Sequence, residues 1–386
     1  MRATHELGGG RARATALSFV LLALLGLVPS ARADEASGRW TGELEGRGNY
    51  YYERSTRVMI PTGRLAPNGV RMNVEYLVDV ISTASVAARS DNKDSVFTEL
   101  RHGIGVGAGK LFALGENELD LSVHAIYSTE TDYYSWIFGA RGAYAFNQKN
   151  TTLSLGVTGV HDTIYRNLNT LGVHDPNFRG ILDGVTTSLG FSQILSPVVT
   201  VGLGYQLVYL TGYQGNPYRR ALVGPLPHEE APPKIRVRHN LEGQLSVYVP
   251  ASSTTFQAFA RLYTDSWDLQ AITPELRIYQ QLGRDWSARL RLRYYLQGRA
   301  EFALPDGQMA YDRTYTGPLT NDPKLRAFHS EQIGLRIAYT LSALGGGPLD
   351  FLSRAVLDVS LDHQWNTSTF NNPHVLIGTL GGRLPF

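Results

Sequence analysis

The sequence predicts an all-β fold: a transmembrane, antiparallel, up-and-down β-barrel of about 16 strands, preceded by a cleaved signal peptide. Three observations predict it. Apolar and polar residues alternate over many short segments, a short apolar run lies near the N-terminus, and the chain ends on an aromatic residue. Inside lipid every backbone amide needs a partner, which only helices and closed barrels provide. Because no later run of about 18 apolar residues could form a spanning helix, the barrel is the predicted solution.

The N-terminal segment has the pattern of an export signal. Three arginines within the first 13 residues precede an apolar run over 16–28, and Ala31-Arg32-Ala33 gives a small-residue cleavage pattern. Such a run is too short to span a bilayer as a helix and is typical of a secretory signal peptide. We therefore predict a signal peptide over residues 1–33 and a barrel domain over residues 34–386, located in the outer membrane of a Gram-negative cell.

Composition narrows the class further. The chain has no cysteine, so it has no thiolate metal site, no disulfide and no lipid-anchor cysteine. Residues 1–33 contain four arginines and one glutamate, so their removal changes the formal charge from +2 to about −1. This balance gives no indication of nucleic-acid binding.

Alternation along the strands predicts which side chains face lipid. In the segment 286–297, one face carries Trp286, Ala288, Leu290, Leu292, Tyr294 and Leu296, and the other carries Ser287, Arg289, Arg291, Arg293, Tyr295 and Gln297. Successive side chains of a strand point to opposite faces, so the first set shares one face. The aromatic residues near the ends of such stripes are typical of the interfacial girdles of membrane barrels.

Turn residues divide the chain into strands. We predict sixteen, at 39–50, 54–64, 69–83, 96–111, 117–128, 133–146, 151–164, 181–194, 198–212, 235–249, 254–266, 270–282, 285–300, 327–341, 353–366 and 374–386. The segment 54–64 contains Pro61, which removes a ladder donor, so fourteen strands is the main alternative and eighteen a weaker one. Even numbers are the rule for bacterial single-chain barrels.

The connections are of two kinds. Short turns at 66–69, 147–150, 196–197, 250–253 and 283–284 fall on one side of the predicted barrel. Long polar stretches at 84–95, 165–180, 213–234 and 301–326 fall on the other side. This partition matches periplasmic turns and extracellular loops, with 342–352 as a longer periplasmic link.

The C-terminus predicts an assembly signal. Leu376, Gly378, Leu380, Gly382 and Leu384 share a strand face with the terminal Phe386. This ending resembles the signal by which barrels are recognised for insertion. We therefore expect the barrel assembly machinery and outer-membrane lipid as partners of this chain.

Two sets of charges face the predicted lumen. The basic set is Arg277, Arg289, Arg291, Arg293 and Arg336. The acidic set is Glu43, Glu45, Glu75, Asp79, Glu118, Asp120, Asp358 and Asp362. Closure of the barrel is expected to place a basic wall across from a largely acidic arc, which would create a transverse field that filters charged solutes. The alternative is that arginines and carboxylates pair and fill a narrow lumen.

An enzymatic reading is disfavoured. Asp120, Ser122 and His124 share a lumenal face and contain the residue types of a hydrolytic triad. However, side chains two positions apart on a strand are about 6.8 Å apart, too far for a nucleophile–base hydrogen bond. The histidine spacing shows no zinc pattern, and no glycine loop for nucleotides exists. We predict no enzyme, no metal and no cofactor.

One stretch resembles a known family. Tyr50-Tyr-Tyr-Glu53, Arg57-Val58, Pro61 and Tyr76-Leu-Val-Asp-Val-Ile-Ser-Thr-Ala-Ser85 look like the opening of a bacterial family of predicted outer-membrane barrels known only as a domain of unknown function. The family hallmark resembles Asp-x-x-Ser-Gly-Ala-Ser-Pro. Asp79, Ser82, Ala84 and Ser85 match it, whereas Thr83 and Val86 replace the Gly and the Pro. The resemblance implies a barrel and links it with periplasmic flavin-transfer and thioredoxin-like proteins.

The sequence therefore predicts a porin-like conduit for small polar or charged solutes, with the arginine row as its filter. The competing class is a closed scaffold barrel that binds a periplasmic or surface partner of an exported, redox-related system. A membrane-embedded hydrolase is a third and weaker candidate.

Overall fold

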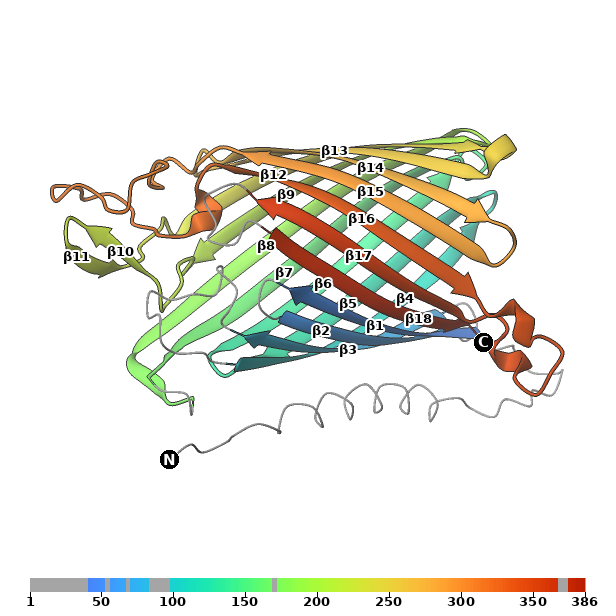
Figure 1. Ribbon diagram of the computed structural model, residues 1–386, viewed down its shortest axis with the longest axis horizontal. Coiled ribbons are helices and arrows are strands. Elements are labelled where there is room, and N and C mark those ends of the chain that lie inside the picture. Colours follow the sequence, from blue (N-terminus) through green and yellow to red (C-terminus); the bar gives the residue numbers. More distant parts are fainter. Residues whose placement is uncertain are drawn as a thin grey trace, which may run out of the picture.

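A computed structural model describes residues 41–52, 56–66, 70–82, 98–168, 172–366 and 374–385. Within these residues sixteen strands close into one antiparallel barrel, in the order β1-β18-β17-β16-β15-β14-β13-β12-β9-β8-β7-β6-β5-β4-β3-β2 (Figure 1). Pairing of β1 with β18 closes the sheet. The predicted all-β barrel and its strand number are confirmed. The predicted signal peptide, Thr83 to Val86 and Phe386 lie outside the described residues.

The barrel strands follow the chain in hairpins. They are β1 (Thr41–Tyr52), β2 (Thr56–Ala66), β3 (Val70–Ser82), β4 (Thr98–Leu114), β5 (Asn117–Thr129), β6 (Tyr133–Phe146), β7 (Thr151–Asn167), β8 (His174–Ser196), β9 (Val199–Gly212), β12 (Ile235–Val249), β13 (Thr254–Asp265), β14 (Gln270–Leu282), β15 (Trp286–Gln297), β16 (Phe328–Thr340), β17 (Val356–Asn366) and β18 (His374–Pro385). A separate hairpin consists of β10 (Arg220–Val223) and β11 (Leu226–Glu229). Four short 3-10 helices are η1 (Pro250–Ser252), η2 (Pro323–Leu325), η3 (Ser342–Leu344) and η4 (Asp350–Leu352). No helix among the described residues is long and apolar enough to cross a membrane.

The outer surface of the barrel is apolar. On β17, Leu357, Val359 and Leu361 are 49%, 54% and 53% exposed, whereas the intervening Asp358 and Asp362 are each only 6% exposed. This is the reverse of a soluble protein, in which the apolar face would be buried. An apolar band that none of the described residues covers suits the hydrocarbon core of a bilayer.

Two prolines interrupt the ladder without breaking the barrel. Pairing between β2 and β3 passes from Met59↔Val78 to Thr62↔Glu75, which leaves out Pro61. Pairing between β14 and β15 likewise passes from Ile272↔Leu296 to Glu275↔Arg293, which leaves out Pro274. Proline has no backbone N–H to donate, so each of the two prolines leaves a local gap in the hydrogen bonding between its strand and the next. The segment with Pro61, which made fourteen strands the main alternative, is therefore a strand of the barrel wall, β2.

The barrel has two unlike ends. Turns such as 147–150, 250–253 and 283–285 join strands at one end, which we call the turn end, and the segment with η3 and η4 lies there too. The segments 213–234 and 298–327 join strands at the opposite end, which we call the loop end. The β7–β8 hairpin differs from the prediction, because strand continues to Asn167 and resumes at His174 where a loop over 165–180 was expected. An ion pair of 2.6 Å between Arg166 and Asp175 joins the two strands there.

The segments 213–234 and 298–327 pack against each other, and together we call them the platform. Isolated bridges join Val223 to Tyr311 and Ala231 to Leu319. Ala221, Leu304 and Tyr311 form a small buried core. A second core around Trp267 and Phe302 connects the platform to the barrel rim. Figure 1 shows the platform extending beyond the end of the barrel, where it adds a folded layer.

Candidate functional site

The predicted basic wall lies on three neighbouring strands. Arg277 of β14 stands opposite Arg291 of β15, and Arg289 stands opposite Arg336 of β16. Residues that pair directly across two strands share a face, so these arginines project to the same side. They alternate with the exposed apolar residues Leu292 and Leu296, so that side is the lumen. Like charges at this separation repel, and the wall needs carboxylates to hold it together.

Glu275 supplies the first of these carboxylates. Arg291 donates to both of its oxygens at 3.0 Å, and the Nε of Arg277 lies 2.5 Å from Oε1. The Nε of Arg293 is 3.8 Å from Oε2. The Glu275 side chain is only 8% exposed, so its charge is largely removed from water and depends on these partners. Sequence reasoning missed Glu275, although it lies two residues before Arg277 and therefore on the same face.

Asp358 and Asp362 of β17 also join the basic wall. The Nη2 of Arg336 lies 2.9 Å from Asp358, and Arg47 of β1 approaches the same carboxylate at 3.6 Å. Asp362 accepts a hydrogen bond from Gln332 at 3.1 Å and lies 3.8 Å from Arg291. The expected separation of acidic from basic residues is therefore wrong for these two aspartates. They lie beside the arginines, because β17 is only one strand from β16.

Glycines make room for these carboxylates. A Cβ on Gly334 would lie 2.0 Å from Asp362, and one on Gly381 would lie 2.6 Å from Asp358. Each aspartate therefore lies flat over a glycine on the neighbouring strand. This keeps the side chains against the wall rather than across the lumen.

Positive charge remains in excess on this side of the barrel. The basic wall together with Arg47 places six arginines against four carboxylates, which are Glu45, Glu275, Asp358 and Asp362. Among the described residues, Arg289 forms no ion pair, and its Nε is buried without a hydrogen-bond partner. Arg238 of β12 shares both properties. These two guanidiniums are the ones most available to a solute anion.

Of the remaining predicted acidic residues, Glu118 and Asp120 lie on the opposite wall. In the closed order β5 is eight strands from β15 in either direction, so Glu118 and Asp120 lie across the lumen from the basic wall. Both are paired locally, Glu118 with Lys149 at 2.5 Å and Asp120 with Arg71. Glu75 on β3 lies over Gly105, and Asp79 is partly buried nearer the loop end. Glu43, on β1, lies 3.8 Å from Arg383.

Buried charges also lie at the loop end. Arg236 donates to Asp265, whose side chain is fully buried, and the Arg236 guanidinium stacks 4.0 Å above the Trp267 ring. Across the barrel mouth, the turn between β5 and β6 holds Glu130, 3.6 Å from Arg101. Burial raises the pKa of the Glu130 carboxyl, the negative charges of Asp132 and Asp79 act in the same direction, and Arg101 opposes them.

The three residues of the hydrolytic alternative do not form a triad. Asp120 is engaged with Arg71. The His124 ring lies over Gly139, where an added Cβ would be 2.2 Å away. In the described part of the chain Ser122 and His124 are not hydrogen-bonded to each other, and no group of three metal-binding side chains occurs there.

Comparisons with known proteins agree with the fold. A family model described as "Protein of unknown function (DUF3570)" matches residues 78–345, well over half of the chain. The chain belongs to the DUF3570 family. The family match begins one residue before Asp79, so the predicted resemblance is confirmed at the level of the family. No curated protein matches this DUF3570 chain.

Solved barrels resemble this DUF3570 protein in fold alone. CdiB from Acinetobacter baumannii aligns with a TM-score of 0.51 at 9% identity, over 90% of this chain and 60% of CdiB. A bacterial polysaccharide outer membrane secretin gives 0.48 at 9% identity, over 89% of this chain and 98% of the secretin. The ferric enterobactin receptor PfeA from Pseudomonas aeruginosa gives 0.45 at 12% identity, over 86% and 54%. The chain thus spans 60% of CdiB and about half of the receptor, and of these three likenesses the one to CdiB supports the fold assignment.

Proposed function

We propose that this DUF3570 protein is an outer-membrane conduit for small polar or charged solutes, with the basic wall as its charge filter. The observation that carries the proposal is the uneven balance of six arginines to four carboxylates on one lumenal wall. Fixed positive charge along a pore raises the local concentration of anions and lowers that of cations.

The size of the barrel supports an aqueous lumen. Barrels of eight strands are filled by side chains, whereas those of sixteen to eighteen strands leave a channel. The lumenal carboxylates lie flat against the wall, over Gly334, Gly381 and Gly105. This position favours an open space along the axis of the barrel. In Figure 1 the platform extends beyond the end of the barrel.

The proposed location follows from the surface. The exposed apolar band suits lipid, and the long segments at the loop end suit an extracellular face. We therefore assign the loop end to the exterior and the turn end to the periplasm. The signal-peptide pattern over residues 1–33 supports export through the inner membrane.

Single-channel recording tests the conduit. The refolded mature chain is added to a planar bilayer under a salt gradient, and stepwise conductance with an anion-selective reversal potential is expected. Replacing Arg289, Arg291 and Arg293 by Ser should move the reversal potential toward cation selectivity. An unchanged reversal potential would show that the arginine row does not set the ion selectivity.

A second candidate is a closed scaffold that binds a partner, and the platform favours it. Glu230, only 6% exposed, accepts hydrogen bonds from the backbone N–H groups of Asn216 and Asn321 and from the Thr320 hydroxyl. Arg219 lies 3.3 Å from the same carboxylate. Such ordering suits a fixed recognition surface. Electrical silence of folded, heat-modifiable protein would favour this scaffold over the conduit.

A further inference from the structure

A groove lies in the outward-facing wall of the barrel, close to the loop end. It crosses the neighbouring strands β9, β12, β13, β14 and β15 and has a volume of about 610 Å³. This is within the range of about 300–1,000 Å³ that is usual for ligand pockets. Because the groove opens on the apolar outer surface, its surroundings would be lipid rather than water.

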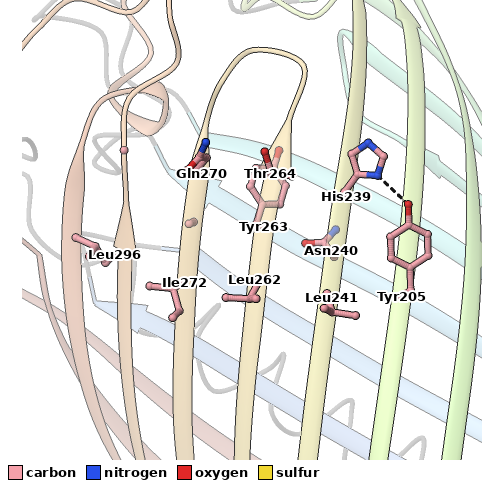
Figure 2. A pocket seen from close by; sticks show the side chains of 12 residues that line it. Tyr205, His239, Asn240, Leu241, Leu262, Tyr263, Thr264, Gln270, Ile272 and Leu296 are labelled. Carbon is pink, nitrogen blue, oxygen red and sulfur yellow. Dashed lines mark hydrogen bonds between the residues drawn. The ribbon is translucent and has the colours of Figure 1, made fainter.

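The groove is polar toward the loop end. His239, Thr264 and Gln270 lie there, and the Tyr205 hydroxyl reaches His239 from the level of Leu241; Figure 2 shows Thr264 and Gln270 near the ends of their strands. Thr264 is the cross-strand partner of both His239 and Gln270, so these three side chains form one row. No lining residue is acidic. The row therefore offers donors without a negative charge to repel an anion.

The groove is apolar toward the middle of the barrel. Leu241, Leu262, Ile272 and Leu296 line this part, and each is at least 40% exposed. In Figure 2 they lie below the polar row on the same outward face. An amphiphile would place its headgroup on the row and its chains on these residues. The order of polar and apolar groups matches that of a lipid in the leaflet nearest the loop end.

The Tyr205–His239 contact prepares a donor. The Tyr205 hydroxyl lies 2.8 Å from the Nδ1 of His239. When the hydroxyl donates to Nδ1, the neutral imidazole carries its proton on Nε2, and that N–H remains a donor for another acceptor. In that tautomer the remaining donor of His239 points away from the Tyr205 hydroxyl.

Histidines also contact aromatic residues on other strands. On β4, His102 lies 2.8 Å from the Tyr76 hydroxyl through its Nδ1. His329 of β16 stacks on Tyr294, with ring centroids 6.0 Å apart, and His363 of β17 contacts Trp365 at 4.1 Å. These residues lie on the same face of their strands as the exposed apolar side chains. Histidine beside an aromatic ring is therefore a repeated feature of the outer surface, and the Tyr205–His239 copy lies in the groove.

We propose that this groove binds one outer-leaflet lipid with a phosphorylated headgroup, held by His239, Thr264 and Gln270, with its acyl chains on the leucine-lined part. The ionised oxygens of a phosphate accept hydrogen bonds from N–H and O–H groups and do not donate any. The inference rests on the membrane location proposed above and is independent of conduction.

Native mass spectrometry of the folded, full mature chain in detergent tests the site, with purified lipid A as the probe. We expect one retained lipid A molecule, about tenfold weaker retention in His239→Leu, and a smaller loss in Tyr205→Phe. His363→Leu is the matched control, because it removes a rim histidine outside the groove, and it should retain lipid A as the wild type does.

A further arm uses dephosphorylated lipid A to test the role of the phosphate. Dephosphorylated lipid A should bind the wild type and His239→Leu equally weakly. Equal retention of lipid A by wild type and His239→Leu would overturn the site, and so would an equal loss in His363→Leu. Mass spectrometry measures lipid binding and not conductance, so a loss of lipid binding does not contradict the conduit proposal. Likewise, a barrel that binds the lipid but shows no conductance still supports this site.

Discussion

The guanidinium of Arg291 donates two hydrogen bonds of 3.0 Å, one to each carboxylate oxygen of Glu275. Arg277 shares the same carboxylate, and its own guanidinium lies 4.5 Å from the Phe259 ring. Glu275 is therefore the centre of a group of arginines that would otherwise repel one another. Removal of one partner from a buried pair leaves the other charges uncompensated, which is more costly than the loss of an exposed pair.

Glu275→Gln should destabilise the barrel by about 3 kcal/mol. Glu242→Gln is the matched control, because Glu242 pairs with Arg261 but is 38% exposed, and its loss should cost less than about 1 kcal/mol. Urea unfolding of the barrel, followed by tryptophan fluorescence, measures both. Equal losses would show that Glu275 does not organise the wall.

Gly334→Ala should also destabilise the protein. The new Cβ would lie 2.0 Å from Asp362, so the carboxylate would have to leave Gln332 and Arg291. A cost of about 1–3 kcal/mol is expected from such overpacking. Gly243→Ala is the control, because nothing lies within 4 Å of its added Cβ. A neutral Gly334→Ala would contradict the packing of Asp362 over the glycine.

Glu230→Ala should loosen the platform and leave the barrel folded. The carboxylate joins the two segments through Asn216, Thr320 and Asn321, so its loss leaves buried donors without an acceptor. Limited proteolysis should cut within 213–234 or 298–327 several times faster than in wild type. Asp306→Ala, at an exposed position of the same segment, should not change the rate. Unchanged cleavage in Glu230→Ala would show that other contacts hold the platform.

Glu130→Gln should reduce the pH dependence of stability. Burial raises the folded-state pKa of this carboxyl above the ordinary value of 4.5, so the folded state keeps its proton after the unfolded state has lost it. Stability contributed by Glu130 is therefore complete below pH 4.5 and falls as pH rises toward the folded pKa. The variant should lose less stability than wild type between pH 4 and pH 7. Urea midpoints across this range measure the effect, and parallel curves would exclude it.

Strand alternation was enough to predict the barrel. Lipid on one side of every strand imposes this alternation, so the signal is present in each segment of the sequence by itself. Alternation also predicts that Arg289, Arg291 and Arg293 share one face. The pairing of Asp358 and Asp362 with the basic wall was not predicted, because it depends on which strands become neighbours and on their register.

Beyond the membrane the local pattern weakens. The extended part of β7 and β8 was expected to be loop, because no lipid requires alternating apolar residues there. Arg166 and Asp175 stabilise it instead, and Arg166 also reaches Glu229 of the platform at 2.5 Å. Likewise the burial of Glu230 results from contacts between segments about 90 residues apart. Such long-range contacts leave no periodic signal in the sequence.

The reversal potential of two lumenal variants tests whether the basic wall is a charge filter. Arg289→Gln removes a positive charge that balances no carboxylate, so it should shift selectivity toward cations. Glu275→Gln removes a negative charge from the same wall and should shift selectivity toward anions, whereas Arg313→Gln on the platform should do neither. Opposite shifts in the two folded lumenal variants are predicted. Unchanged potentials in both, or the same shift in all three, would contradict a charge filter at the basic wall.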